Sequence, residues 1–503
     1  MTSKLILLPI LYQAFMAVIL LFFWRRPQIQ RVISVVGSAI NVFICALLFQ
    51  GVWVDGIVSV QAGNWVAPFG ITFVADTLAA TMVLLTSIAG LAVSIFSAGT
   101  IVRAQVKYGY FPIFHFLLMG LCGAFLTGDI FNLYVWFEII IISSFVLITL
   151  GSEKKQLEGA VKYFALNMLA SIIFLTALGI LYGLVGTLNM ADLSGKVAAV
   201  DNRGLVYVSG LFFFVGFGIK SALFPLYFWL PDSYHTPPFA VSAIFSGLLT
   251  KVGVYALIRV FSLIFTDDIF IDQVMLAIGM LTIFSGGVGA LVQVNIRRVF
   301  SYLIICHIGF IIIGLGLFTE AAIAGAIFYL IHDIVVKTNL FLIAGLIFKI
   351  KGTNDMRKLG GLYDGWPKLT LLMAITLFSL IGIPPLSGFW PKVSLILGAY
   401  SLENYGAIAF ILFGSVITLI IIAKMWSRIF WNPGPVLAVR PDFQYFADMS
   451  LKKRSLIVTP IVLLSAVTLY IGFGAEHIQQ LSERISGELI DPTIYINAVL
   501  KPR

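Results

Sequence analysis

The stretch LTGDIFNLYVWFEIIIISSFVLITL, residues 126–150, is long and apolar enough to cross a lipid bilayer as one helix. It nevertheless carries a glutamate, Glu138, near its middle. An ionisable side chain at the bilayer centre costs about 2.5–3.5 kcal/mol on insertion scales. Such a residue therefore predicts a role in function within a membrane-spanning helix.

The composition of the whole chain indicates an integral membrane protein. Of its 503 residues, 60% are hydrophobic and 11% are charged, whereas a soluble domain carries about 25% charged residues. The net charge of +9 arises from basic residues in short loops. That distribution is typical of membrane orientation, and it predicts no nucleic-acid partner.

Apolar runs long enough to span a bilayer predict an all-α membrane protein with about 14 transmembrane helices. The first run has no cleavage site and is interpreted as a membrane helix. The run at 368–400 is too long for one straight helix and contains three prolines, so we expect it to be broken. The runs lie at 4–24, 31–54, 72–98, 110–127, 129–150, 159–186, 205–230, 237–263, 271–292, 298–318, 321–349, 368–400, 405–430 and 454–474.

Loop charges support this helix count. Every second loop is basic, except that the connection 231–236 holds only Asp232 and His235. Because basic loops stay in the cytoplasm, the alternation places both termini outside. The basic loops contain Arg25, Arg26, Arg31, Arg103, Lys107, Lys154, Lys155, Arg297, Arg298, Lys349, Lys351, Arg357, Lys358, Lys368, Arg440, Lys452, Lys453 and Arg454.

A short internal repeat accompanies the broken run. FPLYFWLP (224–231) and PPLSGFWP (384–391) share a Pro-Leu pair followed by a tryptophan and a proline. In both segments the last proline comes six residues after the proline of the pair. They lie in the seventh and twelfth predicted helices, five helices apart. Helices that are an odd number apart cross the membrane in opposite directions. The two copies of the motif would therefore be inverted, as in many transporters.

Further charged residues lie inside other apolar runs, namely Lys220, Lys251, Lys337 and Lys392, together with His332. Five charges and a histidine at this depth predict a polar path for a proton or a small cation. Burial disfavours a charged lysine and a nearby carboxylate favours it, so an ion pair that opens and closes can bind and release a proton. Glu138 and Lys220 are candidates for such a pair; a static pair that fixes helix packing is the alternative.

The eleventh run adds a second candidate pair. Asp333 and Lys337 are four residues apart and share a helix face, whereas His332 points elsewhere. Histidine suits proton transfer near neutral pH, although His332 could equally be a packing residue. His307 has no charged neighbour in the sequence, and Arg259 is expected to extend outward to water.

Lys392 follows the predicted break and could exchange protons with water there; the alternative is a lysine that extends along the helix to the membrane surface. Asp232 and His235 could feed protons in at the inner end of the seventh helix. A purely structural role is the alternative for Asp232 and His235. The same alternative holds for Asp76 and Asp129 at outer helix ends and for Lys162 near an inner end.

Enzyme signatures are absent from the sequence. It contains no Gly-rich phosphate loop, nucleophile elbow or zinc-ligand spacing, so we expect neither catalytic residues nor a cofactor. Its three cysteines, Cys45, Cys122 and Cys306, lie in separate apolar runs and are interpreted as buried packing residues.

Three segments resemble the antiporter-like subunit family, which includes membrane subunits of respiratory complex I and of Mrp-type sodium/proton antiporters. They are TGDIFNLYVWFE (127–138), GIKSALFPLYFWLPDSYHTPPFAVSAIFSGLLTKVGVY (218–255) and IHDIVVKTNLFLIAG (331–345). GTLNMADLS (186–194) is most similar to the D-subunit branch of the Mrp antiporters. The resemblance implies fourteen helices with two inverted five-helix repeats, 110–263 and 271–430, and with broken helices 7 and 12.

The resemblance also implies roles for individual residues. Glu138 would be the fifth-helix glutamate and Lys220 its partner, Lys251 the central lysine of the eighth helix, and Lys392 the terminal residue of the path. His332 and Lys337 would form the relay of the eleventh helix. Some complex I relatives carry glutamate where this chain has Lys392.

The implied function is proton translocation in a multisubunit sodium/proton antiporter of the bacterial cell membrane. The expected partners are other membrane subunits, protons, sodium and lipid. Three alternatives remain open at this stage: a proton-pumping subunit of a quinone-coupled respiratory complex, a stand-alone metabolite transporter, and a scaffold whose charges only fix packing. Where sodium crosses is not predicted by the sequence.

Overall fold

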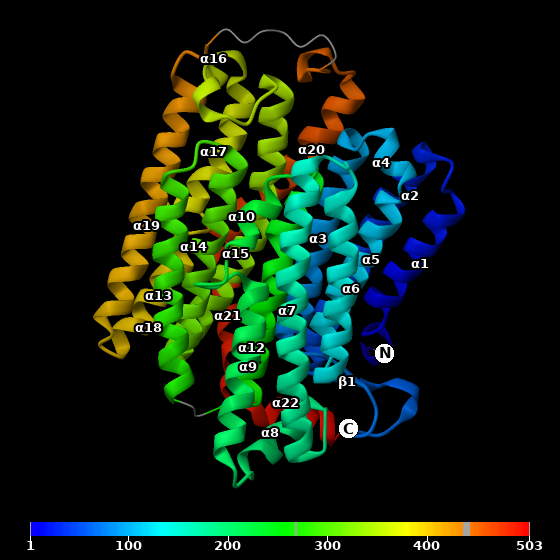
Figure 1. Cartoon of the computed structure of the whole chain (residues 1–503), viewed down its shortest axis with the longest axis vertical. Coiled ribbons are helices and arrows are strands. Elements are labelled where there is room, and N and C mark those ends of the chain that lie inside the picture. The colour runs from blue at the N-terminus through cyan, green and yellow to red at the C-terminus, as the bar shows by residue number, and fades with distance from the viewer. Residues whose placement is uncertain (1, 267–268, 436–442, 502–503) are drawn as a thin grey trace.

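The computed structural model describes residues 2–266, 269–435 and 443–501, so the predicted loop residue Arg440 lies outside it. Long helices run side by side between two faces of the molecule (Figure 1). In the described part, twelve helices are long and apolar enough to cross a membrane, and Tyr110–Leu126 and Pro367–Ile381 are shorter apolar helices. The all-α membrane class is confirmed, while the count of fourteen spans stays a prediction.

The chain up to residue 263 forms twelve α-helices and one β-hairpin. The helices are α1 (Leu8–Phe22), α2 (Pro27–Asp55), α3 (Thr77–Thr100), α4 (Arg103–Lys107), α5 (Tyr110–Leu126), α6 (Ile130–Thr149), α7 (Lys154–Val185), α8 (Met190–Ala198), α9 (Arg203–Ser221), α10 (Trp229–Tyr234), α11 (Phe239–Ile244) and α12 (Thr250–Leu263). The antiparallel strands are β1 (Val58–Gln61) and β2 (Thr72–Ala75), with Val58 opposite Ala75.

The remaining chain is helical between its loops. Its helices are α13 (Ile269–Leu291), α14 (Ile296–Leu317), α15 (Glu320–Lys351), α16 (Leu362–Gly365), α17 (Pro367–Ile381), α18 (Trp390–Ser401), α19 (Tyr405–Trp426), α20 (Leu451–Phe473), α21 (Ala475–Ile490) and α22 (Pro492–Leu500). The predicted third span, 72–98, begins too early: residues 72–75 form β2, and α3 starts only after Asp76, whose carboxylate accepts a hydrogen bond from the Ala79 amide.

The seventh and twelfth spans are broken, as predicted. α9 ends at Ser221 and α10 begins at Trp229, while α17 ends at Ile381 and α18 begins at Trp390. Proline lacks the N–H that continues a helix, and each gap contains the Pro-Leu pair. Both breaks leave backbone carbonyl groups without helical partners inside the bundle.

One further irregularity lies in the eighth span. α11 and α12 form one continuous helix joined by η3 (Phe245–Leu249), a π-helical turn. A π-helical turn shifts the backbone hydrogen-bond register by one residue, and such turns occur frequently at functional sites. Lys251 lies two residues after this turn, in the first turn of α12.

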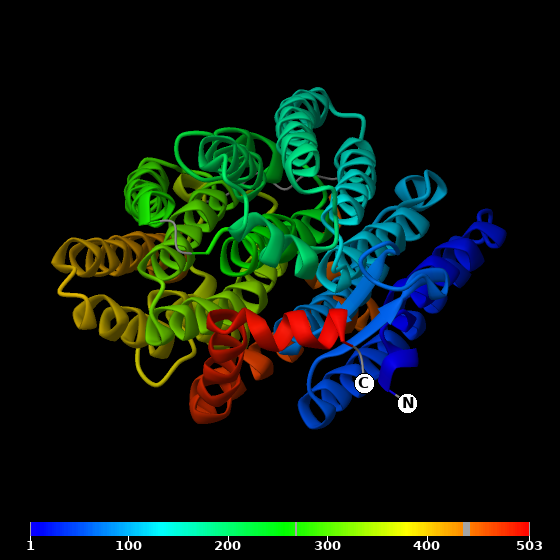
Figure 2. The ribbon, with the colours of Figure 1, turned by 90° about the horizontal axis from the view of Figure 1, so that it is seen from below.

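The two termini lie at the same end of the bundle, together with the β-hairpin (Figure 1). α22 lies across that end (Figure 2), and α21 leads down along the bundle to it (Figure 1); the sequence analysis predicted neither helix. Under this cover Arg259 is only 4% exposed and pairs with Asp76 at 2.5 Å. The expectation that Arg259 extends to water is therefore wrong, because the α22 residue Tyr495 stacks on its guanidinium at 5.1 Å.

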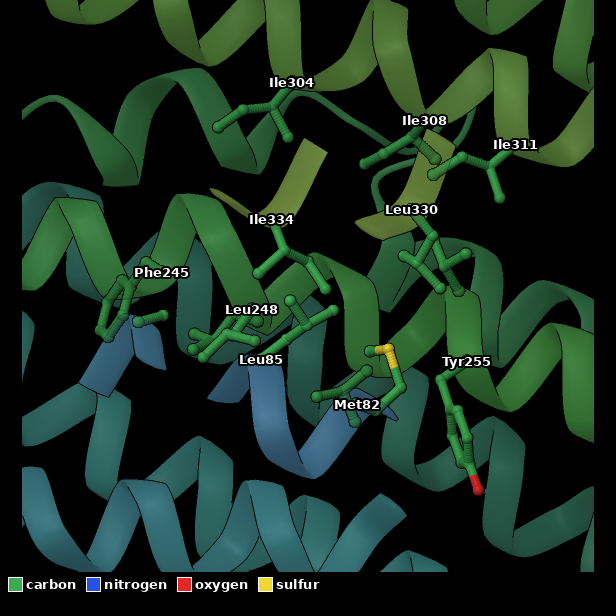
Figure 3. Packing of buried hydrophobic residues seen from close by; sticks show 14 of the residues in the cluster. Met82, Leu85, Phe245, Leu248, Tyr255, Ile304, Ile308, Ile311, Leu330 and Ile334 are labelled. Carbon is green, nitrogen blue, oxygen red and sulfur yellow. The ribbon is translucent and has the colours of Figure 1, made fainter. Parts of the chain in front are cut away.

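The core is built around α15. Every residue from Ala322 to Ile347 is buried, as befits a helix that is apolar around its whole circumference. Figure 3 shows the packing of Leu330 and Ile334 of α15 among side chains of α3, η3, α12 and α14. The polar residues of α15 consequently lie deep in this apolar core. The three cysteines are buried, as predicted.

Candidate functional site

A carboxylate shared by two lysines forms the centre of the candidate path. Asp333 Oδ2 lies 2.7 Å from Lys251 Nζ, and its Oδ1 lies 3.8 Å from Lys337 Nζ. All three side chains are fully buried. The predicted contact between Asp333 and Lys337 is confirmed, but the shorter ion pair joins α15 to α12, and the sequence analysis missed it.

His307 of α14 belongs to the same cluster. Its Nδ1 is 3.6 Å from Asp333 Oδ1, and its Nε2 is 3.2 Å from Thr418 Oγ1. The absence of a charged neighbour in the sequence was therefore misleading. The neighbour comes from another helix, and only the packing of α14 against α15 brings it close.

Each lysine of the cluster also has a backbone carbonyl partner. Lys251 Nζ donates to the Ser246 carbonyl at 2.9 Å, which the π-helical turn η3 presents on the side of Lys251. Lys337 Nζ donates to the Leu303 carbonyl at 3.0 Å. Ser246 Oγ in turn donates to the Lys337 carbonyl at 3.0 Å, so the two lysine-bearing helices are tied together at this level.

The predicted partners Glu138 and Lys220 form no ion pair among the residues that the structure describes. Lys220 Nζ donates to Ser171 Oγ at 3.2 Å and lies 4.8 Å from the centroid of the Phe137 ring. Glu138 is half-buried, and its Oε1 is buried without a hydrogen-bond partner. Its role as the partner of Lys220 stays a prediction.

A small cavity lies beside Lys220. It has a volume of about 20 Å³, and Asn167, Tyr163 and Trp229 line it together with aliphatic side chains. A cavity of this size can hold about one water molecule when polar groups face it. Lys220 therefore has room for a solvent partner inside the bundle.

The backbones of α9 and α12 touch between Lys220 and Lys251. A Cβ atom on Gly253 would stand 2.6 Å from Ser221 Oγ and 3.1 Å from the carbonyl carbon of Lys220. Two hydroxyl groups near this contact, on Ser221 and Thr250, are buried without a hydrogen-bond partner in the described structure. Buried hydroxyl groups of this kind are suited to hydrogen-bond with water.

His332 and Lys392 meet the break of the twelfth span. His332 Nδ1 and Ser387 Oγ are 2.7 Å apart, and Ser387 Oγ is 2.8 Å from Ser379 Oγ. Lys392 Nζ donates at 2.7 Å to the Ile381 carbonyl, which the end of α17 frees. His332 does point away from Lys337, as predicted, and its Nε2 is buried without a hydrogen-bond partner in the described part of the chain.

Asp232 and His235 lie apart from this buried line, near the face that carries the basic loops. Asp232 pairs with Lys162 at 2.7 Å and with Arg298 at 2.8 Å. Burial alone would raise the pKa of Asp232, but these two cations lower it below its ordinary value. Burial lowers the pKa of His235 to about 4, and its Nδ1 donates to the Pro231 carbonyl at 2.7 Å.

The other polar residues have structural contacts. Asp129 caps α6 by accepting a hydrogen bond from the Asn132 amide at 2.7 Å, and burial raises its pKa to about 6. Asp76 caps α3 and pairs with Arg259. Their placement at helix ends agrees with the sequence.

Sequence reasoning missed Asp333 as the centre of the cluster, the place of His307 beside it, and the hydroxyl partners Ser171 and Ser387. A signal for Asp333 existed, because an aspartate in a fully apolar helix needs a cation and Lys337 was within reach. No sequence signal could have assigned Lys251 to it, since the two residues belong to different helices.

Comparison with known proteins gives a consistent result. The family described as NADH:quinone oxidoreductase/Mrp antiporter, TM matches residues 127–418. The chain is 43% identical to the D subunit of the Na(+)/H(+) antiporter of Alkalihalophilus pseudofirmus and 38% identical to that of Bacillus subtilis, in each case over 99% of this chain and 100% of the relative.

Two solved structures share the fold over 99% of this chain. A chain of the Mrp complex from Dietzia sp. superposes with a TM-score of 0.90 at 28% identity, over 99% of its own length. A chain of the membrane-bound sulfane sulfur reductase, an archaeal respiratory membrane complex, superposes with a TM-score of 0.87 at 25% identity, over its full length.

Proposed function

As the chain belongs to the NADH:quinone oxidoreductase/Mrp antiporter transmembrane family, we propose that it is the proton-translocating subunit of a multisubunit sodium/proton antiporter. It is a subunit of a cation/proton antiporter, since relatives that match it over their whole length carry that name. Its partners are other membrane subunits, because the structural neighbours come from multisubunit membrane complexes.

The observation that carries the proton path is the single carboxylate between two lysines. Asp333 carries one negative charge and faces two lysines, so it can compensate the charge of Lys251 or of Lys337 more fully than both at once. A proton that reaches one lysine therefore weakens the hold of Asp333 on the other. The cluster supports stepwise transfer by pairwise changes of charge.

The proposed line runs from Glu138 and Lys220 through Lys251 to Lys337 and His332, and ends at Lys392. Backbone contact at Gly253 brings the first two lysines' helices together. Ser387 joins His332 to the break where Lys392 binds the Ile381 carbonyl. Unpartnered buried oxygens and nitrogens along the line are suited to water molecules that complete it.

Asp232 and His235 would form the proton entrance, and their surroundings determine the protonation state of each. Asp232 is held as a carboxylate by its two cations, and His235 is neutral at pH 7 because its pKa is about 4. We propose that they relay protons without accumulating charge.

We propose further that 110–263 and 271–430 are inverted repeats. α9 runs toward the face of the basic loops before its break, whereas α17 runs away from that face before its own break (Figure 1). The same Pro-Leu pair stands in both breaks. The opposite directions of these two helices support an inverted relation.

The proposed location is the bacterial cell membrane, with both termini outside. The basic loops gather at the face opposite the two termini (Figure 1), and basic loops stay in the cytoplasm. Fusing a reporter that is active only outside the membrane to the C-terminus tests this orientation; an inactive fusion in an expressed, assembled complex would contradict it.

The test of function is replacement of Glu138 or Lys220 by alanine in the assembled complex. We expect sodium/proton exchange in membrane vesicles to be abolished while the complex still assembles. Unchanged exchange in both variants would refute the path. Loss of assembly in both would instead favour a scaffold whose charges only fix packing.

A respiratory complex is the second candidate, because the archaeal reductase chain shares the fold at 25% identity. The antiporter relatives match at 38–43% identity over 99% of the chain, so antiport is better supported. Co-purification with iron–sulfur subunits would favour the respiratory alternative.

A further inference from the structure

An open crevice separates the start of α2 from the start of α20, far from the proton path. Its volume is about 510 Å³, and α2, the end of α3 and α20 line it. Its deep end is closed where α3 meets α20, since a Cβ on Gly99 would stand 3.0 Å from Leu456 Cβ. Both long helices start at the face of the basic loops, so the crevice opens at the level where lipid headgroups meet water (Figure 1).

The mouth of the crevice is cationic. Arg31, Lys452 and Lys453 line it, and no carboxylate of the described residues pairs with any of the three. Arg31 donates one hydrogen bond to the Ile101 carbonyl at 2.8 Å, and its Nε is buried without a partner among the residues that the structure describes. Three cations that no described carboxylate compensates leave this mouth suited to an anion.

The wall of the crevice is apolar below these charges. Val32 and Val36 of α2 are 63% and 52% exposed, and Leu456 of α20 faces them from the other side. The valines follow Arg31 toward the bilayer centre along α2. A cationic mouth above an apolar wall matches a molecule with an anionic head and a hydrocarbon tail.

The start of α20 strengthens this match. Lys452 and Lys453 occupy its first turn, where the helix dipole disfavours cations, and Ser450 makes no side-chain cap. α7 also begins with two lysines, but Glu153 and Gln156 complete a capping box there. The first turn of α20 therefore lacks the negative partner that α7 has within its own sequence.

We propose that this crevice binds one anionic phospholipid, with its phosphate among Arg31, Lys452 and Lys453 and an acyl chain along Val32 and Val36. The lipid would fasten α2 to α20, two helices that are distant in sequence. A zwitterionic lipid would match the apolar wall but would leave the cationic mouth uncompensated, so the site discriminates by headgroup charge.

Native mass spectrometry of the assembled complex tests the proposal. The complex is loaded with phosphatidylglycerol or with phosphatidylethanolamine, and the retained lipid is counted for wild type, K452Q/K453Q, R31Q and the control K154Q/K155Q. The control removes two first-turn lysines from the same face outside the crevice. Each crevice charge should contribute on the order of fivefold in affinity.

The expected result is specific retention of phosphatidylglycerol by wild type and control, about a fivefold loss in R31Q and a larger loss in K452Q/K453Q. If K452Q/K453Q fails to assemble, the comparison of R31Q with wild type and control tests the proposal. The proposal would be overturned if all variants retained the lipid equally or if both lipids were retained equally. Displacement of the lipid by excess inorganic phosphate would also overturn it, because the crevice would then be a simple anion site.

Discussion

Replacing Asp333 by asparagine should damage this protein more than removing either lysine beside it. The variant keeps the shape of the side chain but leaves Lys251 and Lys337 buried without a carboxylate. In K337M, by contrast, Asp333 keeps Lys251 at 2.7 Å, and Lys251 keeps the Ser246 carbonyl at 2.9 Å. The structure thus predicts an asymmetry between the carboxylate and its partners.

The magnitude follows from the distances. With an effective dielectric constant of about 20, Coulomb attraction is roughly 6 kcal/mol for Lys251 at 2.7 Å and roughly 4 kcal/mol for Lys337 at 3.8 Å, before desolvation is subtracted. Removing one partner of a buried ion pair costs about 3–5 kcal/mol net. We expect D333N to lie in that range, and K337M to cost less.

Two variants complete the comparison. D333N/K251M removes one of the two uncompensated cations and should be more stable than D333N alone. D355N makes the same chemical change in a surface pair, where Asp355 meets an arginine that is 65% exposed, and should cost about 1 kcal/mol or less. It controls for asparagine substitution as such.

The assays are thermal unfolding of the assembled complex and sodium/proton exchange in vesicles. D333N should lower the unfolding midpoint most and abolish exchange in the complex that remains, whereas D355N should change neither measurably. If D333N were no less stable than D355N, or if it still exchanged protons for sodium, the shared-carboxylate mechanism would be refuted.

Three further substitutions have distinct expectations. G253A should abolish exchange while every path charge remains, because its Cβ would stand 2.6 Å from Ser221 Oγ and force α9 from α12; normal exchange would contradict this. H235Q should leave the pH profile of exchange unchanged between about pH 6 and 8, since the pKa of His235 is about 4 and the residue is neutral there. D232N should cost about 1 kcal/mol or less at pH 7, because its partners are partly exposed. The pKa of Asp232 is lowered in the folded protein, so its ion pairs stabilise the fold fully above the ordinary pKa of about 3.9. This stabilisation is lost as the pH falls through the pKa of the folded protein. Wild type and D232N should therefore have the same stability in strong acid in unfolding experiments.

Much of the fold could be predicted because a bilayer imposes simple rules on a sequence. A span needs a run of apolar residues, and prolines within a long run break it, so the residues themselves predicted the broken span at 368–400. The break of the seventh span was implied only by the family resemblance. The hairpin of β1 and β2 and the helices α21 and α22 were not predicted. The hairpin and α22 lie at one end of the bundle, where the length of an apolar run no longer constrains the chain, and α21 leads to that end.

The candidate path was predictable in its members but not in its contacts. Lys251 and Lys337 stood out because a charge in an apolar helix is costly. The preference of Lys251 for Asp333, however, depends on the packing of the α11–η3–α12 helix against α15, which local patterns do not encode. Glu138 and Lys220 illustrate the reverse case, since two conspicuous charges were paired by sequence reasoning and form no ion pair in the described structure.

The sequence by itself determined that this is a helical membrane protein with costly charges inside its spans, because hydrophobicity and charge are properties of single residues and their spacing. Only the tertiary structure decided which charges compensate each other. Electrostatic and hydrogen-bond energies change steeply over a few ångströms, and those distances are set by helices far apart in the chain. Glu138 stood out from sequence alone as a costly charge in an apolar span, whereas the place of Asp333 between Lys251 and Lys337 became evident only through folding.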